Sequence, residues 1–189
     1  MTIPNILSSF RLILAPVLLV LAWSSYSTGF MIVLIIAFLL DAVDGPIARW
    51  LNQESELGPK LDSWADFSIY LTFLIGAWWL WPEIVMRELI FILLTLASII
   101  FPVIMSIYKF RKVTSYHTWL VKIAAVCMAP SAILLFLIDY SWTFRLASIV
   151  CVMASIEEIL ITMVLKKPHS NVQSIFHVRK DCVKKMMDK

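Results

Sequence analysis

The chain has 189 residues, of which 61% are hydrophobic and 15% are charged, and its formal net charge is +3. A soluble domain has roughly a quarter of its residues charged, so this composition excludes an ordinary soluble domain and predicts an all-α integral membrane protein. The positive charge gathers in residues 166–189, which favours an anionic membrane surface over nucleic acid as a partner. The three cysteines form no Cys-x-x-Cys motif, so neither a zinc site nor a disulfide framework is predicted.

Six apolar segments are long enough to form membrane-spanning helices, which need about 20 residues each. The loops between them are short, which favours a tight bundle of antiparallel neighbours. A membrane β-barrel would show alternating segments of roughly ten residues, a pattern that this chain lacks. The six predicted helices cover about residues 6–23, 30–50, 61–81, 84–108, 119–138 and 142–165.

The distribution of Lys and Arg predicts the orientation, because cytoplasmic loops of membrane proteins carry an excess of both. With six helices, 14 of the 16 Lys and Arg residues fall on one side, and only Arg87 and Arg145 fall on the other. Trp and Tyr gather at the loops of that other side, as they do at membrane interfaces. We therefore expect both termini to face the cytoplasm, with a six-helix domain over residues 1–165 and a basic cytoplasmic tail over residues 166–189.

Four aspartates stand at the ends of apolar segments, where a carboxylate is costly. Asp41 and Asp44 are three residues apart, and Asp62 and Asp66 are four apart, so on a helix each pair shares one face. If residues 52–58 join two helices, the four carboxylates converge and repel one another. One or two hard cations such as Mg²⁺ or Mn²⁺, which take oxygen ligands, would offset that repulsion. The alternative is that the aspartates are structural and pair with nearby basic residues. That alternative explains less well why the four aspartates share this spacing.

The spacing of these residues resembles a known signature, Asp-x2-Asp-Gly-x2-Ala-Arg-x8-Gly-x3-Asp-x3-Asp, which is the motif of the class I CDP-alcohol phosphotransferase family. Residues 4–16 also look like the Pro-Asn-x-Leu-Thr-x-x-Arg opening of the family, with Ser8 in place of Thr. The resemblance covers residues 3–165 and is much weaker after the motif. All the fixed positions of the signature match: Asp41, Asp44, Gly45, Ala48, Arg49, Gly58, Asp62 and Asp66.

The resemblance implies an enzyme of phospholipid biosynthesis that transfers a phosphatidyl group from CDP-diacylglycerol to a small alcohol and releases CMP. It implies two Mg²⁺ or Mn²⁺ ions, one held by Asp41, Asp44 and Asp62, the other by Asp41, Asp62 and Asp66. Asp66 is similar to the general base proposed for the family, and an alcohol nucleophile needs such a base within hydrogen-bond reach. The resemblance further implies a homodimer, which we expect in a bacterial inner membrane with its active site on the cytoplasmic side.

The resemblance also implies where the CDP-lipid binds. Gly45 is expected against the nucleotide and Arg49 on a phosphate, which a guanidinium can bind through two hydrogen bonds. A small residue such as Ala48 lets a base or a phosphate approach the helix backbone closely. The remaining expected contacts to the CDP-lipid are Asn5, Ser8, Ser55 and Gly58.

Basic residues at the ends of the fourth and fifth predicted helices are candidates for binding the acceptor. A cationic pocket suits a phosphate-bearing alcohol, and glycerol 3-phosphate is our first expectation. Ordinary positive-inside charges are the alternative. Residues 115–122 also depart from the Gly-Lys-x-Lys-Thr-x-x-Gln pattern usual in phosphatidylglycerophosphate synthases. The candidates are Lys109, Arg111, Lys112 and Lys122, of which Lys122 is the strongest because it lies inside a helix.

Other functions stay open at this point. Within the same family, the acceptor would be inositol phosphate or serine, or a CDP-linked small alcohol would react with diacylglycerol. A small cation-coupled transporter is a different class of protein. It predicts ion flux without CMP release and leaves the spacing of Gly45, Ala48 and Gly58 unexplained.

Overall fold

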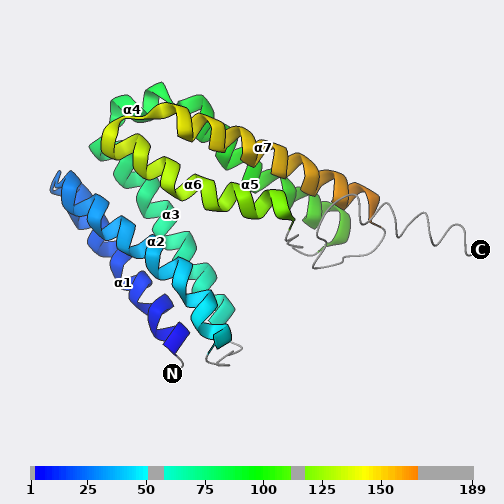
Figure 1. Ribbon diagram of the computed structural model, residues 1–189, viewed down its shortest axis with the longest axis horizontal. Helices are drawn as coiled ribbons and strands as arrows, with labels where there is room; N and C mark the ends of the chain where they lie inside the picture. The colour runs from blue at the N-terminus through cyan, green and yellow to red at the C-terminus, as the bar shows by residue number, and fades with distance from the viewer. Residues whose placement is uncertain (1–2, 51–57, 112–117, 166–189) are drawn as a thin grey trace, which may run out of the picture. The chain divides into compact units, whose positions relative to one another are not determined.

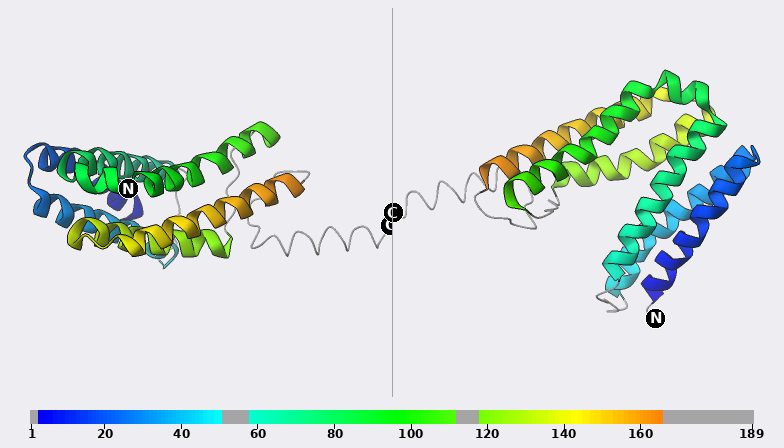
Figure 2. Two further views of the ribbon diagram at one scale, coloured as in Figure 1. Left: turned by 90° about the horizontal axis from the view of Figure 1, so that it is seen from above. Right: turned by 180° about the vertical axis from the view of Figure 1, so that it is seen from behind.

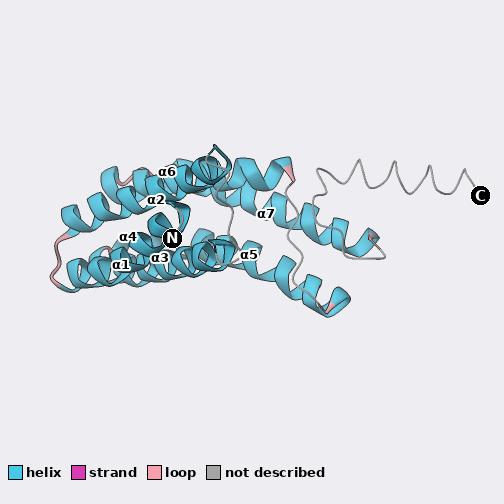
Figure 3. Cartoon of the chain, turned by 90° about the horizontal axis from the view of Figure 1, so that it is seen from below, coloured by secondary structure: helices cyan, strands magenta, loops and turns pink. Residues whose placement is uncertain are grey.

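The computed structural model describes residues 3–50, 58–111 and 118–165. These ranges contain seven helices joined by short loops and turns, and no strand (Figures 1 and 3). The all-α prediction is therefore confirmed for the part of the chain that the structure describes. The helices are α1 (Ile3–Trp23), α2 (Ser27–Trp50), α3 (Gly58–Leu80), α4 (Pro82–Arg87), α5 (Leu89–Phe110), α6 (Trp119–Ile138) and α7 (Ser141–Val164).

Five of the six predicted helices agree with the structure to within three residues at each end, and the fourth is wrong at its start. In place of one helix from residue 84, the short α4 ends at Arg87 and α5 begins at Leu89. The helix breaks at Glu88, whose backbone leaves the helical region with φ −99° and ψ 13°. Glu88 is fully buried, and its carboxylate accepts two hydrogen bonds from Arg145 on α7.

Four helices of the described residues are long and apolar enough to cross a membrane, namely α1 from Asn5, α5, α6 and α7. In α2 the apolar stretch is shorter and covers Ser27–Val43. The first turns of α3 carry Lys60, Asp62 and Asp66, which lowers the hydropathy of that helix. The prediction of six spans, with both termini in the cytoplasm, thus stays a prediction.

The chain divides into two compact units, residues 1–86 and residues 87–189. In the first unit, α1 packs along both α2 and α3 (Figures 1 and 2). The buried residues of α1 recur every three or four positions and so form one stripe on the helix. The opposite face of α1 is exposed and apolar, as expected of a surface that meets lipid. The buried stripe consists of Asn5, Ser8, Arg11, Ala15, Leu18 and Ala22.

In the second unit, α7 packs along both α5 and α6. Small residues of α7, among them Ala147 and Ala154, are buried and let the helices approach closely. Thr95 on α5 donates a hydrogen bond to Ser148 on α7, with 3.0 Å between the two hydroxyl oxygens. Close packing through small residues and hydroxyl hydrogen bonds is typical of helices that associate in a membrane.

Candidate active site

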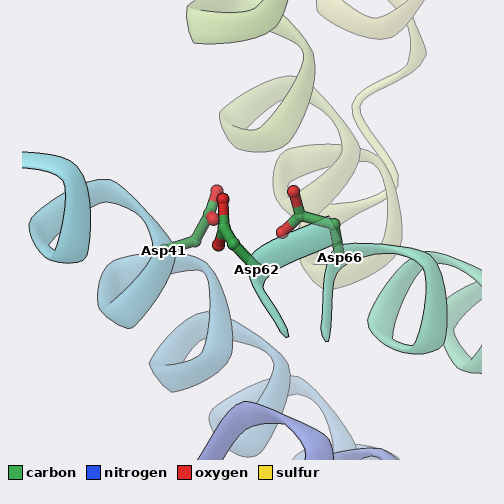
Figure 4. Close-up of side chains that lie close together, drawn as sticks. All are labelled: Asp41, Asp62 and Asp66. Atoms are coloured by element: carbon green, nitrogen blue, oxygen red, sulfur yellow. The ribbon is translucent and has the colours of Figure 1, made fainter. Parts of the chain in front are cut away.

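Three of the four predicted aspartate side chains come together in the first unit. Asp41 belongs to α2, and Asp62 and Asp66 belong to α3. One carboxylate oxygen from each lies within 4.8 Å of the other two, and Figure 4 shows the three groups facing a common point. The fourth, Asp44, belongs to α2, but its side chain lies outside the described residues. We call Asp41, Asp62 and Asp66 the acidic triad.

The packing of α2 and α3 explains why these carboxylates meet. Asp41 continues the buried stripe of α2 that contains Phe30, Leu34 and Ala37, since steps of three and four residues keep to one helix face. On α3 the buried residues Ala65 and Ile69 alternate with the two aspartates in the same way. Burial of the apolar stripes against α1 therefore brings the carboxylates to the same end of the unit.

Arg11 of α1 reaches all three carboxylates of the acidic triad. Its Nη1 donates to Asp62 Oδ1 at 2.9 Å. Its Nη2 forms an ion pair with Asp41 Oδ1 at 2.8 Å and also donates to Asp66 Oδ1. The Arg11 side chain is only 2% exposed, whereas the aspartates are 35–43% exposed. The guanidinium thus approaches the triad from the buried side, and the carboxylates stay open on the other.

Arg11 is the residue of this site that the sequence analysis missed as a site residue. It is the Arg of the family's N-terminal opening, and the resemblance alone assigns it no contact with the aspartates. One signal was available, because a cation inside an apolar helix is costly and generally has a functional partner. The spacing Asn5, Ser8, Arg11 is a second signal, since steps of three residues place them on one face.

The acidic triad has the donor set that a hard divalent cation requires. All its ligand atoms are carboxylate oxygens, which Mg²⁺ and Mn²⁺ prefer. Three carboxylates and one guanidinium leave two formal negative charges at this point. The partial exposure of the aspartates gives a cation access from outside the helix bundle. The predicted ligand set of Asp41, Asp62 and Asp66 therefore fits such an ion. The other predicted set includes Asp44, whose side chain lies outside the described residues.

The expected CDP-lipid contacts are only partly described. Asn5 and Ser8 are buried on the stripe of α1 that also carries Arg11, and Gly58 is the first residue of α3. Gly45, Ala48 and Arg49 lie within α2, but their side chains are outside the described residues. Ser55 lies entirely outside them.

The described acceptor candidates all belong to the second unit, where they have local partners. Lys109 Nζ donates to the backbone oxygen of Met163 at 2.7 Å, so it stabilises the carboxyl end of α7. Lys122 Nζ stands 5.1 Å from the centre of the Trp119 ring. Arg111 ends α5 in the left-handed backbone region. Lys112 lies outside the described residues. Their role towards an acceptor stays a prediction.

Comparison with known proteins establishes the family. The profile described as CDP-alcohol phosphatidyltransferase matches residues 1–163. The chain therefore belongs to the CDP-alcohol phosphatidyltransferase family, as the motif predicted, and the match includes both units. No solved structure shows significant similarity to this chain.

Several curated proteins match parts of the chain. The CDP-diacylglycerol--glycerol-3-phosphate 3-phosphatidyltransferase of Aquifex aeolicus is 37% identical over 95 residues, which are 50% of this chain and 52% of the relative. The CMP-forming cardiolipin synthase of Rattus norvegicus is 48% identical over 66 residues, 34% of this chain and 22% of the relative. The human cardiolipin synthase (CMP-forming) matches to the same extent. The chain thus spans about half, or less, of the length of these relatives.

Proposed function

We propose that this protein is an enzyme that transfers the phosphatidyl group of CDP-diacylglycerol to the hydroxyl of an alcohol and releases CMP. The observation that carries the proposal is the convergence of Asp41, Asp62 and Asp66 in a chain of this family. A transporter would need no such spacing around Gly45 and Gly58, and the family match supports transfer over transport.

The reaction is a substitution at phosphorus. The oxygen of the acceptor hydroxyl forms a bond to the β-phosphorus, which carries the diacylglycerol. The bond between that phosphorus and the bridging oxygen breaks, and CMP leaves with the electron pair. Asp66 takes the proton of the attacking hydroxyl, because a carboxylate beside the reacting oxygen raises its nucleophilicity. The other residues act by positioning and by charge, as is usual in phosphoryl transfer.

The acidic triad would hold one divalent cation, and Asp44 would contribute to a second. When bound, such cations offset the charge of the diphosphate and the charge that develops on the departing CMP. Enzymes of this family depend on divalent metal in general, which supports this reading of the triad. Asn5, Ser8 and the motif residues Gly45 and Arg49 would hold the nucleotide part of the donor.

Glycerol 3-phosphate is the first candidate for the acceptor. Two observations support it: the name of the Aquifex aeolicus relative, and basic residues such as Lys122 inside a helix of the second unit. The departure of residues 115–122 from the usual synthase pattern speaks against it.

A second candidate is favoured by the relatives named cardiolipin synthase (CMP-forming). Cardiolipin carries two phosphatidyl groups on one glycerol, so its formation with release of CMP requires phosphatidylglycerol as the acceptor. The nucleophile is again a glycerol hydroxyl. The same triad and the same base would therefore serve either acceptor.

The location and assembly are part of the proposal. The enzyme is an integral membrane protein whose triad faces the cytoplasm, as the positive-inside rule predicts for the side that carries most Lys and Arg. It acts as a homodimer, as the family resemblance implies. Cysteine labelling of the loops from each side of the membrane tests the orientation, and cross-linking in the membrane tests the dimer.

The experiment that tests the reaction uses the purified protein in detergent with CDP-diacylglycerol and Mn²⁺. Glycerol 3-phosphate, phosphatidylglycerol, inositol phosphate and serine are supplied one at a time, and mass spectrometry identifies the lipid product. We expect CMP and a new phosphodiester lipid with one glycerol-type acceptor. CMP release with inositol phosphate or serine alone would show that the acceptor is not of the glycerol type. No CMP release with any acceptor would contradict CDP-diacylglycerol as the donor.

A further inference from the structure

Arg11 contacts the same three carboxylates that would neutralise the charge of a bound metal cation. Its guanidinium donates to one oxygen of Asp62 at 2.9 Å and pairs with one oxygen of Asp41 at 2.8 Å. It also donates to Asp66. A single buried side chain thus supplies positive charge to all three carboxylates that lie within 4.8 Å of one another.

Without a counter-charge, this arrangement would be unfavourable. Three carboxylates at such separations repel one another strongly at an effective dielectric constant of about 20. Arg11 offsets that repulsion from the buried side, where water cannot. A divalent cation entering from the exposed side would meet both the carboxylates and the positive charge of the guanidinium. Two cations this close together repel each other strongly, because the effective dielectric constant near a protein is well below that of water.

We propose that Arg11 is the internal counter-ion of the acidic triad, and that its guanidinium and a divalent cation compete for the same three carboxylates. The proposal rests on the proposed function, since it takes the triad as the metal site. Arg11 keeps the carboxylates together while the site holds no metal, and its positive charge weakens the binding of a cation that enters from the exposed side. The coupling between the two is negative and reciprocal.

The competing account makes Arg11 a positioning residue that holds the carboxylates ready for the metal. The two accounts predict opposite results when the charge is removed. If Arg11 competes, Arg11→Gln binds Mn²⁺ more tightly. If Arg11 only positions, the same substitution leaves the carboxylates misplaced and weakens binding.

Arg145 offers a matched control. It is also an arginine in a carboxylate pair, since its Nη2 lies 2.7 Å from Oε1 of Glu88. It belongs to the other unit of the chain and contacts none of the triad residues through its described hydrogen bonds. Arg145→Gln removes the same charge and tests the general effect of losing an ion pair.

The experiment measures free Mn²⁺ by electron paramagnetic resonance in titrations of the purified full chain. Thermal unfolding of the same samples is followed with Mn²⁺ and with a chelator. For Arg11→Gln we expect the dissociation constant for Mn²⁺ to fall on the order of tenfold, within the usual range of coupling between two sites. We also expect the substitution to lower the unfolding temperature more in chelator than in saturating Mn²⁺. Arg145→Gln should leave the dissociation constant unchanged and lower both unfolding temperatures equally.

An unchanged or larger dissociation constant in Arg11→Gln overturns the proposal while leaving the metal site in place. If Arg11→Gln does not fold, Arg11→Lys decides, because its compact ammonium keeps the charge but cannot span three carboxylates as a guanidinium does. We expect it to bind Mn²⁺ more tightly than the parent, and equal or weaker binding overturns the proposal. If the parent itself binds no Mn²⁺, the metal site of the proposed function is wrong and the role of Arg11 falls with it.

Discussion

Arg145 and Glu88 form a bidentate ion pair that joins α7 to the start of α5. Arg145 donates from Nε to Oε2 of Glu88 at 2.8 Å and from Nη2 to Oε1 at 2.7 Å. The Glu88 side chain is fully buried, and Arg145 is about one third exposed. This pair occurs at the point where the chain leaves α4 and enters α5, so it explains the break in the helix between them.

The first prediction concerns the pH dependence of stability. Hydrogen bonds from Arg145 hold the pKa of Glu88 below its ordinary value. A carboxylate with a lowered pKa in the folded chain stabilises the fold above its ordinary pKa of about 4.3, and this contribution is lost as the pH falls through the lowered value. Glu88→Gln should therefore unfold at a lower temperature than the parent at pH 7, and the difference should shrink towards pH 3.

The control for this prediction is the neighbouring pair of Arg87 and Asp139. Its Nη1 to Oδ2 separation is 3.2 Å, and the Asp139 side chain is 56% exposed. Exposed ion pairs contribute little to stability, so Asp139→Asn should change the unfolding temperature less than Glu88→Gln at pH 7. A pH profile of Glu88→Gln that runs parallel to that of the parent would show that the buried pair is not the origin of the acid loss.

The helix positions were predictable from the sequence because apolar length decides them. Glu88 was not, because no Gly or Pro marks a break there, and the partner that draws its side chain inward is 57 residues away in the chain. Arg11 shows the same limit at the site. The aspartate spacing predicts that the carboxylates of the acidic triad meet. A cation inside an apolar helix indicates that Arg11 has a partner, but the contacts of Arg11 span 51 and 55 residues, so no local pattern tells which residues those partners are.

The second prediction concerns the packing of α3 on α2. A Cβ atom at Gly76 would lie 2.4 Å from Cε2 and 2.5 Å from Cζ of Phe30, whose side chain is fully buried. Because the ring is buried and would have to shift against its neighbours, Trp81 among them, Gly76→Ala should lower the free energy of unfolding by about 1–3 kcal/mol. Thermal unfolding in detergent measures the change.

Gly29→Ala is the matched control for Gly76→Ala. Its added Cβ would meet the ring of Tyr26, which is 57% exposed and can swing outward. Alanine is also the better helix former by about 1 kcal/mol. We expect Gly29→Ala to cost less than Gly76→Ala. Equal losses in the two variants would mean that the contact with Phe30 does not limit the approach of the two helices.

The third prediction tests the ligands of the proposed metal site. Asp41 is assigned to both ions. Loss of a residue that only supports a metal ligand already weakens metal binding by about tenfold or more. Asp41→Ala, which removes a ligand itself, should therefore raise the dissociation constant for Mn²⁺ by more than about tenfold. Titration with detection of free Mn²⁺ measures it, and Asp139→Ala, which removes a carboxylate of the other unit, should match the parent. If Asp41→Ala kept the metal titration of the parent, the assignment of the triad would be wrong.

The fourth prediction concerns the proposed base. Asp66→Asn keeps the size and shape of the side chain but cannot accept the proton of the acceptor hydroxyl. We expect folding and the binding of CDP-diacylglycerol to be retained, while turnover falls by about 10²–10⁴-fold, which is the usual contribution of a general base. Thermal unfolding and a binding assay with CDP-diacylglycerol separate this loss from a loss of structure.

The most direct test of the account is the release of CMP from CDP-diacylglycerol by the parent and by Asp66→Asn, measured side by side with Mn²⁺ and with a chelator. The account predicts CMP release by the parent with Mn²⁺ and a glycerol-type acceptor, little release in chelator, and a loss of release in Asp66→Asn despite intact folding. Chelator-insensitive release, or near-parent release by Asp66→Asn, would contradict the assignment of the acidic triad as the centre of the transfer reaction.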